Sequence, residues 1–354
     1  MKRTTKYVGM DVHQASTVVS VRDDSGRLIV QSVLETSGPS LVEFFSGMRG
    51  ALHVAFEEGT QSQWLYDLLT PVADRVVVCD GRVVRREGNK GDRVDADRLS
   101  ELLRLGGLRP VYHGSSRRAD LKELTRIYRS LVGDSTRVMS RIKALYRARA
   151  VATYGSAVYR AASRAEWLAE LGGGGVQFRA GALHAELDLL RELRRKAKVR
   201  MVAEATRDPA WKILRSIPFF GPVRVALLLA VIDNPWRFRT KRQLWAYSGL
   251  AVVTWSTADH MFVAGQPVRR PRAPLTRGLN RNHNPVLKNV FKGAAVAAMS
   301  RRGALQDFYD CLVGRGLREE LARVTLARKL AAVTLRLWKS GEHYDPAKLT
   351  MQVR

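Results

Sequence analysis

The chain has 354 residues, 45% of them hydrophobic, which is enough for two or three domains that each bury a core. Its two cysteines, Cys79 and Cys311, lie far apart and lack metal-ligand spacing, which excludes a disulfide framework and a structural zinc site. No apolar run approaches the length of a membrane span, and the basic N-terminal residues lead into a strand-like segment rather than an apolar signal region. We therefore expect a cytoplasmic protein with no membrane partner.

The charge of the chain is strongly positive, because 60 Lys and Arg oppose 33 Asp and Glu, for a formal net charge of +27. Such a charge repels itself unless a polyanion neutralises it. Basic residues recur in most segments, for example in 82–93, 191–200 and 269–281, rather than in one tail. A solvated basic surface is the alternative, but the spread favours several surfaces that contact the phosphates of a nucleic acid.

The first third of the chain predicts alternating strands and helices. Three segments rich in β-branched residues predict strands at 6–12, 16–22 and 27–35, and Asp23-Asp24-Ser25-Gly26 is typical of a hairpin turn. The elements expected after them are a helix at 39–48, a strand at 53–58, a helix at 63–69 and a strand at 75–79. This order predicts a mixed α/β sheet such as that of the ribonuclease H-like fold, although many α/β domains begin in the same way.

The middle third predicts two long helices. Apolar residues recur at spacings of three and four from Leu121 to Leu145 and again from Leu183 to Met201, which is typical of heptad seams. The glycines at 172–175 separate the two seams and lack the Lys-Ser/Thr of a phosphate-binding loop. We expect an antiparallel helical hairpin or coiled coil, which pairs either within the chain or between two copies.

The last third predicts helices around one irregular segment. A Pro- and Gly-containing turn at 217–222 separates two helices, and further helices are expected at 241–249, 286–300 and 318–339. The stretch at 251–284 has no clear periodicity, so we expect an irregular loop there. Loops held by a helical scaffold commonly carry function, and chemistry is therefore expected in this stretch.

Four acidic positions are candidates for binding a divalent cation. Asp11 lies in the first strand, Glu58 ends the fourth after a second acid, Glu57, and Asp92 and Asp95 share one face at the start of a helix. Carboxylate oxygens suit Mg²⁺, which would offset the repulsion between the acids and could act at a phosphate. The alternatives are structural, since the last two acids also fit N-cap and N3 positions and the others could cap a helix or end a strand.

Three segments resemble the blocks of the DEDD transposases, which have a RuvC-like N-terminal domain: 7–13, 58–60 and 89–96. The second half is similar to the serine-bearing transposase domain of the same family at 216–221, 236–238, 244–249 and 278–291. We therefore expect an α/β ribonuclease H-like (RuvC-like) catalytic domain at 1–112, a helical coiled-coil region at 113–208, and a mainly α, serine-bearing transposase domain at 209–354.

The resemblance implies a DNA transposase that cuts and exchanges strands with a bound metal and a serine nucleophile. The implied ligands of Mg²⁺ or Mn²⁺ are Asp11, Glu58, Asp92 and Asp95, with Glu57 as the alternate for Glu58. A serine hydroxyl needs a base or a metal to become a good nucleophile, and no His–Asp relay is evident near the implied serine, Ser256, so the metal ion would have to serve.

The implied nucleophile is Ser256, which would form a covalent phosphoserine intermediate. Here Thr257 stands where glycine is usual in the family, so Thr257 and Ser248 remain alternatives for the nucleophile. His260 and His283 lie near the serine in sequence, but neither is assigned a role.

Nucleic acid is the expected partner of the C-terminal third. The residues expected to contact phosphates are Arg269, Arg270, Arg272, Arg277, Arg281 and Lys288. The resemblance further implies donor and target DNA and a bridge RNA encoded in the ends of the insertion-sequence element. A homo-oligomer, dimer or tetramer, is expected because the two apolar seams should pair and recombination needs two DNA partners held together. Two other classes remain open: a hydrolytic RuvC-like nuclease or junction resolvase, and a basic nucleic-acid-binding scaffold without catalysis.

Overall fold

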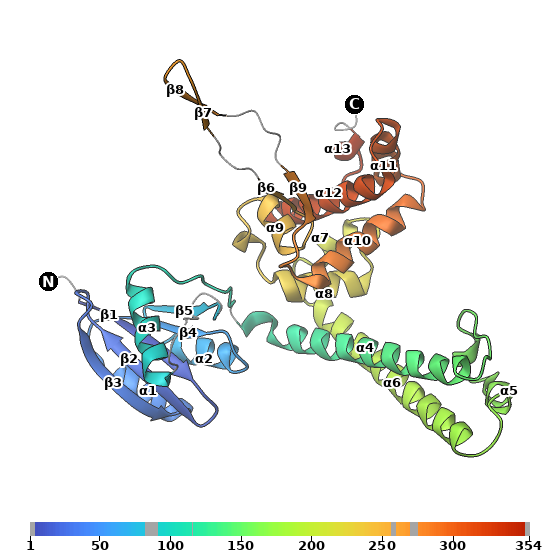
Figure 1. Cartoon of the computed structure of the whole chain (residues 1–354), viewed down its shortest axis with the longest axis horizontal. Coiled ribbons are helices and arrows are strands. Elements are labelled where there is room, and N and C mark those ends of the chain that lie inside the picture. Colours follow the sequence, from blue (N-terminus) through green and yellow to red (C-terminus); the bar gives the residue numbers. More distant parts are fainter. Residues whose placement is uncertain (1–3, 82–90, 115, 256–259, 270–274, 351–354) are drawn as a thin grey trace. The chain divides into compact units, whose positions relative to one another are not determined.

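The computed structural model describes residues 4–81, 91–114, 116–255, 260–269 and 275–350. The chain divides into two compact units, residues 1–117 and 118–354 (Figure 1). Each unit has its own hydrophobic core. The first unit is mixed α/β and the second is mostly helical, as the sequence predicts. No helix within the described ranges is both long and apolar enough to cross a membrane.

The N-terminal unit is built on a five-stranded mixed sheet in the order β3-β2-β1-β4-β5. Strand β1 pairs antiparallel with β2 and parallel with β4, β2 pairs antiparallel with β3, and β4 pairs parallel with β5. The strands are β1 (Thr5–Val12), β2 (Ser16–Arg22), β3 (Leu28–Glu35), β4 (Ala51–Glu57) and β5 (Arg75–Cys79). All of the strands predicted for this unit are confirmed, with ends that shift by one or two residues.

The turn between β2 and β3 follows the predicted hairpin. The carboxylate of Asp23 accepts hydrogen bonds from the backbone N–H groups of Ser25 and Arg27, each at 2.9 Å. Gly26 has a φ of 89°, a left-handed conformation that glycine adopts without a Cβ clash. The predicted helices are confirmed as α1 (Gly38–Ser46) and α2 (Ser62–Leu69), and the segment that follows residue 91 forms α3 (Asp92–Arg104).

Different helices pack on the two faces of this sheet. Because successive side chains in a strand alternate, Val8 and Met10 face one side and Gly9 faces the other. The core with α1 and α2 lies on the first side and contains Val8, Met10, Val54, Phe56, Leu41, Phe45, Leu65 and Leu69. Helix α3 covers the second side, where Leu99 packs on Cys79 and Leu103 packs with Ala55 and Val77. The site described below lies at the α3 side of the sheet.

The second unit begins with a long helical hairpin. Helices α4 (Ala119–Arg147) and α6 (Gly175–Thr206) pack along each other, with α5 (Arg164–Ala169) near the hairpin tip (Figure 1). Their core contains residues of both predicted seams: Val138, Ile142, Leu145, Leu183 and Leu187. Of the two arrangements left open by the sequence, the structure has the pairing within one chain.

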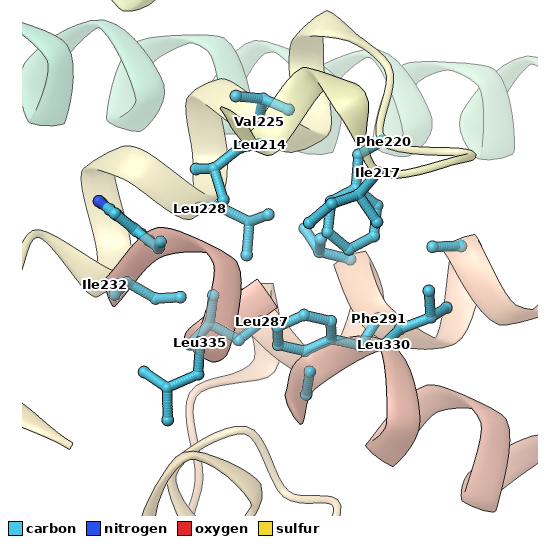
Figure 2. Packing of buried hydrophobic residues seen from close by; sticks show 14 of the residues in the cluster. Leu214, Ile217, Phe220, Val225, Leu228, Ile232, Leu287, Phe291, Leu330 and Leu335 are labelled. Carbon is cyan, nitrogen blue, oxygen red and sulfur yellow. The ribbon is translucent and has the colours of Figure 1, made fainter. Parts of the chain in front are cut away.

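The remaining helices form a compact helical body. They are α7 (Trp211–Ser216), α8 (Pro222–Ile232), α9 (Lys241–Tyr247), α10 (Pro285–Met299), α11 (Ala304–Gly314), α12 (Glu319–Ser340) and α13 (Ala347–Thr350). Figure 2 shows the core between them, where Leu214 and Leu228 point toward Leu287, Phe291 and Leu330. The predicted helix, turn and new helix around 217–222 are confirmed by α7 and α8.

The expectation of an irregular stretch at 251–284 was wrong in part, because this stretch contains two short β-ribbons. Strand β6 (Val252–Trp255) pairs with β9 (Leu275–Leu279), and β7 (His260–Val263) pairs with β8 (Gln266–Arg269). The strands are only four or five residues long, which leaves little periodicity to detect, and β7 is exposed throughout, so it lacks the alternation of a half-buried strand. Periodicity therefore gave no signal for them.

Candidate functional site

Helix α3 lies unusually close to β1, and the cause is Gly9. A Cβ at Gly9 would overlap the backbone of Ala96 and Ser100 and would lie 2.8 Å from the Cβ of Leu99. Only a residue without a side chain lets the helix backbone approach the strand so closely. This contact fixes the start of α3 near the end of β1.

We expect Gly9→Ala to destabilise the N-terminal unit by about 1–3 kcal/mol, because the added methyl meets helix backbone rather than a flexible side chain. Amide hydrogen exchange of peptides from α3, followed by mass spectrometry, should become faster in this variant. The matched control is Gly59→Ala, since a Cβ at Gly59 would meet nothing within 4 Å. Equal exchange in both variants would contradict the close approach.

Three side chains converge where β1 ends and α3 begins. Asp11, His13 and Asp92 each offer a ligand atom, and these atoms lie within 4.8 Å of one another. Asp11 is two residues beyond Gly9 and therefore shares its face, while Asp92 is the first residue of α3. The side chains are 24%, 49% and 62% exposed for Asp11, His13 and Asp92, so solvent or a phosphate can reach them.

His13 lies between the two acids. Its Nε2 is 3.3 Å from Oδ2 of Asp11 and 3.5 Å from Oδ2 of Asp92. Sequence reasoning did not select His13, although it was part of the segment at 7–13 that resembles the family. The signal was its spacing of two from Asp11 at the end of a strand, which directs both side chains to one face.

The carboxyl group of Asp11 is in an environment that disfavours its negative charge. Burial raises the pKa of Asp11, and the charges of Asp92 and Asp95 raise it further, whereas His13 lowers it. Asp95 thus acts on Asp11 through its charge, although it is not among the three residues whose ligand atoms converge. A bound divalent cation would offset this repulsion between carboxylates.

The residues at this site fit a divalent metal ion. Two carboxylates supply the oxygen ligands that Mg²⁺ and Mn²⁺ prefer, and an imidazole nitrogen is a further donor that suits transition metals. The capping alternative for Asp92 is not what the structure has, because Gly91 is the N-cap of α3 and no side chain caps it. Asp92 and Asp95 lie in the first turn, where the helix dipole favours negative charge.

The fourth acid is Glu57 or Glu58, and the register of the sheet distinguishes their faces. Gly9 pairs with Ala55 and Met10 with Phe56, so the next pair in sequence is Asp11 with Glu57. Glu57 pairs with Cys79 of β5. Burial raises the pKa of the Cys79 thiol to about 12, and the negative charge of Glu57 contributes to this increase. Cys79 packs on α3, so Glu57 shares the face of Asp11, while alternation directs Glu58 to the other face.

The second half of the predicted site is described only in part. Ser256, Thr257, Arg270 and Arg272 lie outside the described residues. Arg269 belongs to β8 and Arg277 to β9, Arg281 is exposed between β9 and α10, and Lys288 is half-buried in α10. The two units are described separately, so the acids and these residues are placed only within their own unit.

Ser248, the weaker alternative nucleophile, is fully buried. Its hydroxyl donates a hydrogen bond to the carbonyl of Leu244 at 2.6 Å, within helix α9 and its C-terminal turn. A hydroxyl that is buried and already donating cannot approach a DNA phosphate without a local rearrangement. These contacts argue against a nucleophilic role for Ser248.

Two family models match the chain. One, for IS110-type DEDD transposases and described as "Transposase", matches residues 8–148, and the other, described as "Transposase IS116/IS110/IS902 family", matches residues 211–310. The first match includes the converging acids, and the second includes α7 to α10 and most of α11. A comparison with the curated proteins gave no match.

Proposed function

The chain belongs to the IS110 family of DEDD transposases, and from this we propose that it cuts and exchanges DNA strands with a divalent metal ion and a serine nucleophile. Membership of a transposase family implies that the protein binds and modifies DNA. The observation that carries the metal-dependent part is the convergence of Asp11, His13 and Asp92 at the end of β1.

We propose that Asp11, Asp92 and Asp95, together with Glu57 or Glu58, hold Mg²⁺ or Mn²⁺. When bound there, the ion supplies positive charge that stabilises the charge developing on a reacting phosphate. The strand order of the N-terminal sheet supports a ribonuclease H-like fold, with three antiparallel strands followed by two parallel ones. Its face geometry favours Glu57 over Glu58 as the fourth acid.

Ser256 is proposed as the nucleophile. Its hydroxyl oxygen would form a bond to phosphorus while the bond from phosphorus to one DNA oxygen breaks, and the hydroxyl proton would pass to a base or to water. This exchange replaces one phosphate ester by another, so the energy of the DNA linkage is conserved and ATP is not required. The support for Ser256 is its position within the second family match.

Two partners beyond DNA are part of the proposal. A bridge RNA is proposed from the family resemblance, and the net charge of +27 supports binding of more than one polyanion. A dimer or tetramer is proposed because two DNA partners must be held together. Since the heptad seams pack within the chain, self-association would need another surface, such as Leu189, Leu193 and Val199 on α6, which are 57%, 39% and 59% exposed.

The experiment that tests the metal site compares Glu57→Gln with Glu58→Gln. Cleavage of DNA carrying the ends of the element should require Mg²⁺ or Mn²⁺ and should stop when EDTA is added. We expect Glu57→Gln to slow cleavage by about 100-fold or more, because it removes a group that holds the ion, and Glu58→Gln to have a far smaller effect.

Labelled DNA on denaturing gels gives both cleavage rates. The two variants control each other, because each removes one negative charge from adjacent exposed residues. A larger loss in Glu58→Gln would return the fourth position to Glu58. Cleavage that persists in EDTA would remove the metal-dependent mechanism and favour a scaffold or another chemistry.

A further inference from the structure

A cavity in the second unit carries an unusual concentration of positive charge. It has a volume of about 590 Å³ and lies along α12, between α9 and α11. One face of α12 supplies most of its lining, at spacings of three and four residues from Thr325 to Lys339. The cations that line it are Arg239, Lys241, Arg328, Lys329, Arg336 and Lys339.

The residues that line this cavity, all within the described part of the chain, include no acid. Burial lowers the pKa of Lys329, and the neighbouring charges of Lys241 and Arg336 lower it further. The cations therefore repel one another in a partly desolvated place. An anion in the cavity would relieve this repulsion and would be bound by several charged groups at once.

Two aromatic rings lie among these cations. The indole of Trp245 is fixed by a 2.9 Å hydrogen bond from its Nε1 to the carbonyl oxygen of Arg328, and Nζ of Lys241 lies 5.6 Å from its ring centroid. The ring of Phe308 has Nζ of Lys329 at the same distance, 5.6 Å. Cations for phosphates beside aromatic faces for bases are the composition that binds single-stranded nucleic acid.

We propose that this cavity binds an unpaired nucleotide, with its phosphates on the α12 cations and its base against Trp245. The volume lies within the range of about 300–1,000 Å³ typical of ligand pockets, which suits one nucleotide of a single strand rather than a duplex. The assignment goes beyond the proposed function, because this second nucleic-acid site needs neither the acidic cluster nor a metal ion.

The test uses the full-length protein in EDTA, so that binding is measured without cleavage. Single-stranded oligothymidine and oligouridine that carry 5-iodouracil are irradiated with the protein, and the cross-linked peptides are mapped by mass spectrometry. We expect cross-links on the peptide that contains Trp245 and their loss in Trp245→Leu. The two oligomers distinguish a DNA strand from an RNA strand as the occupant, and cross-linking by either supports the site.

Affinities are measured in parallel by fluorescence anisotropy. The double variant Lys241→Ala/Arg336→Ala changes two exposed residues and should retain the fold, whereas the half-buried Trp245 is a less safe position. We expect the double variant Lys241→Ala/Arg336→Ala to weaken single-strand binding by about tenfold or more and to change duplex binding far less. The matched control is Arg195→Ala/Lys198→Ala, which removes two exposed cations of α6 in the same unit.

Equal losses in the two double variants would overturn the proposal, because the effect would then reflect net charge alone. Cross-links that map only outside the cavity would overturn it as well. Since neither readout involves cleavage, failure here leaves the metal-dependent mechanism standing, and failure of the metal test leaves this site standing.

Discussion

Asp11→Asn is expected to reduce DNA cleavage by about 10³-fold or more while nucleic-acid binding stays nearly unchanged. The substitution removes one negative charge from the group formed with His13 and Asp92, and with it a ligand for the metal ion. Binding persists because it depends on the 60 Lys and Arg rather than on the acids. Asp92→Asn should behave in the same way, and because its side chain is 62% exposed we expect this variant to fold normally.

The free energy of unfolding of Asp11→Asn shows whether the loss of DNA cleavage comes from a missing metal ligand or from a folding defect. Burial and the nearby acids raise the pKa of Asp11 above 3.8, so the free energy of unfolding contributed by this group falls as the pH rises from 3.8 through the raised value. At neutral pH the ionised carboxylate is therefore a cost, and Asn should leave stability unchanged or slightly higher. Unfolding in denaturant measures the free energy of unfolding of the variant and of the unchanged protein.

The matched control for both acids is Asp67→Asn, an exposed acid of α2 in the same unit. Its side chain accepts a hydrogen bond from Gln63 and lies outside the converging group. We expect near-normal cleavage from this variant. Normal cleavage by Asp11→Asn, or an equal loss in Asp67→Asn, would contradict the assignment of the metal ligands.

Ser256→Ala is expected to eliminate a covalent link between protein and DNA. If Ser256 attacks the phosphate, a stalled reaction contains protein joined to one strand end, and this adduct survives denaturation. A hydrolytic nuclease forms no such adduct and would keep most of its activity without this hydroxyl. Denaturing gels with labelled DNA and peptide mapping of the adduct give the answer.

Thr257→Ala and Ser248→Ala are the position controls for this experiment. Ser248→Ala should keep the adduct, since its hydroxyl is buried and bonded to Leu244. An adduct on Thr257 would move the nucleophile by one residue and preserve the mechanism. Free cleaved ends from Ser256→Ala at an undiminished rate would favour the hydrolytic alternative.

The sheet of the first unit could be predicted because its strands are β-branched and its turns carry Asp, Ser and Gly. The relation between Asp11 and Asp92 could be expected from the family resemblance, but their proximity depends on Gly9. The residues around Gly9 in the sequence do not indicate that the backbone of α3 packs against this glycine. His13 was missed for a related reason, because its partners come from two elements that are far apart in the chain.

Other features of the structure could not be predicted from the spacing of apolar residues in the sequence. The choice between Glu57 and Glu58 depends on the parallel register of β1 with β4, which one strand by itself does not encode. The heptad spacing predicted two helices that pair, yet the same spacing serves pairing within or between chains. The cation-lined cavity beside α12 joins residues from three helices, and the sequence offered only a general excess of positive charge.

We propose that the acids at the end of β1 and the start of α3 form a metal centre. Its most direct test is iron-mediated cleavage of the protein itself, in which Fe²⁺ replaces the native ion and ascorbate with peroxide generates hydroxyl radicals beside it. We expect backbone cuts close to Asp11 and Asp92, suppressed by excess Mg²⁺ or Mn²⁺ and absent from Asp11→Asn. Cuts at other places, or the same cuts in Asp11→Asn, would contradict the metal centre.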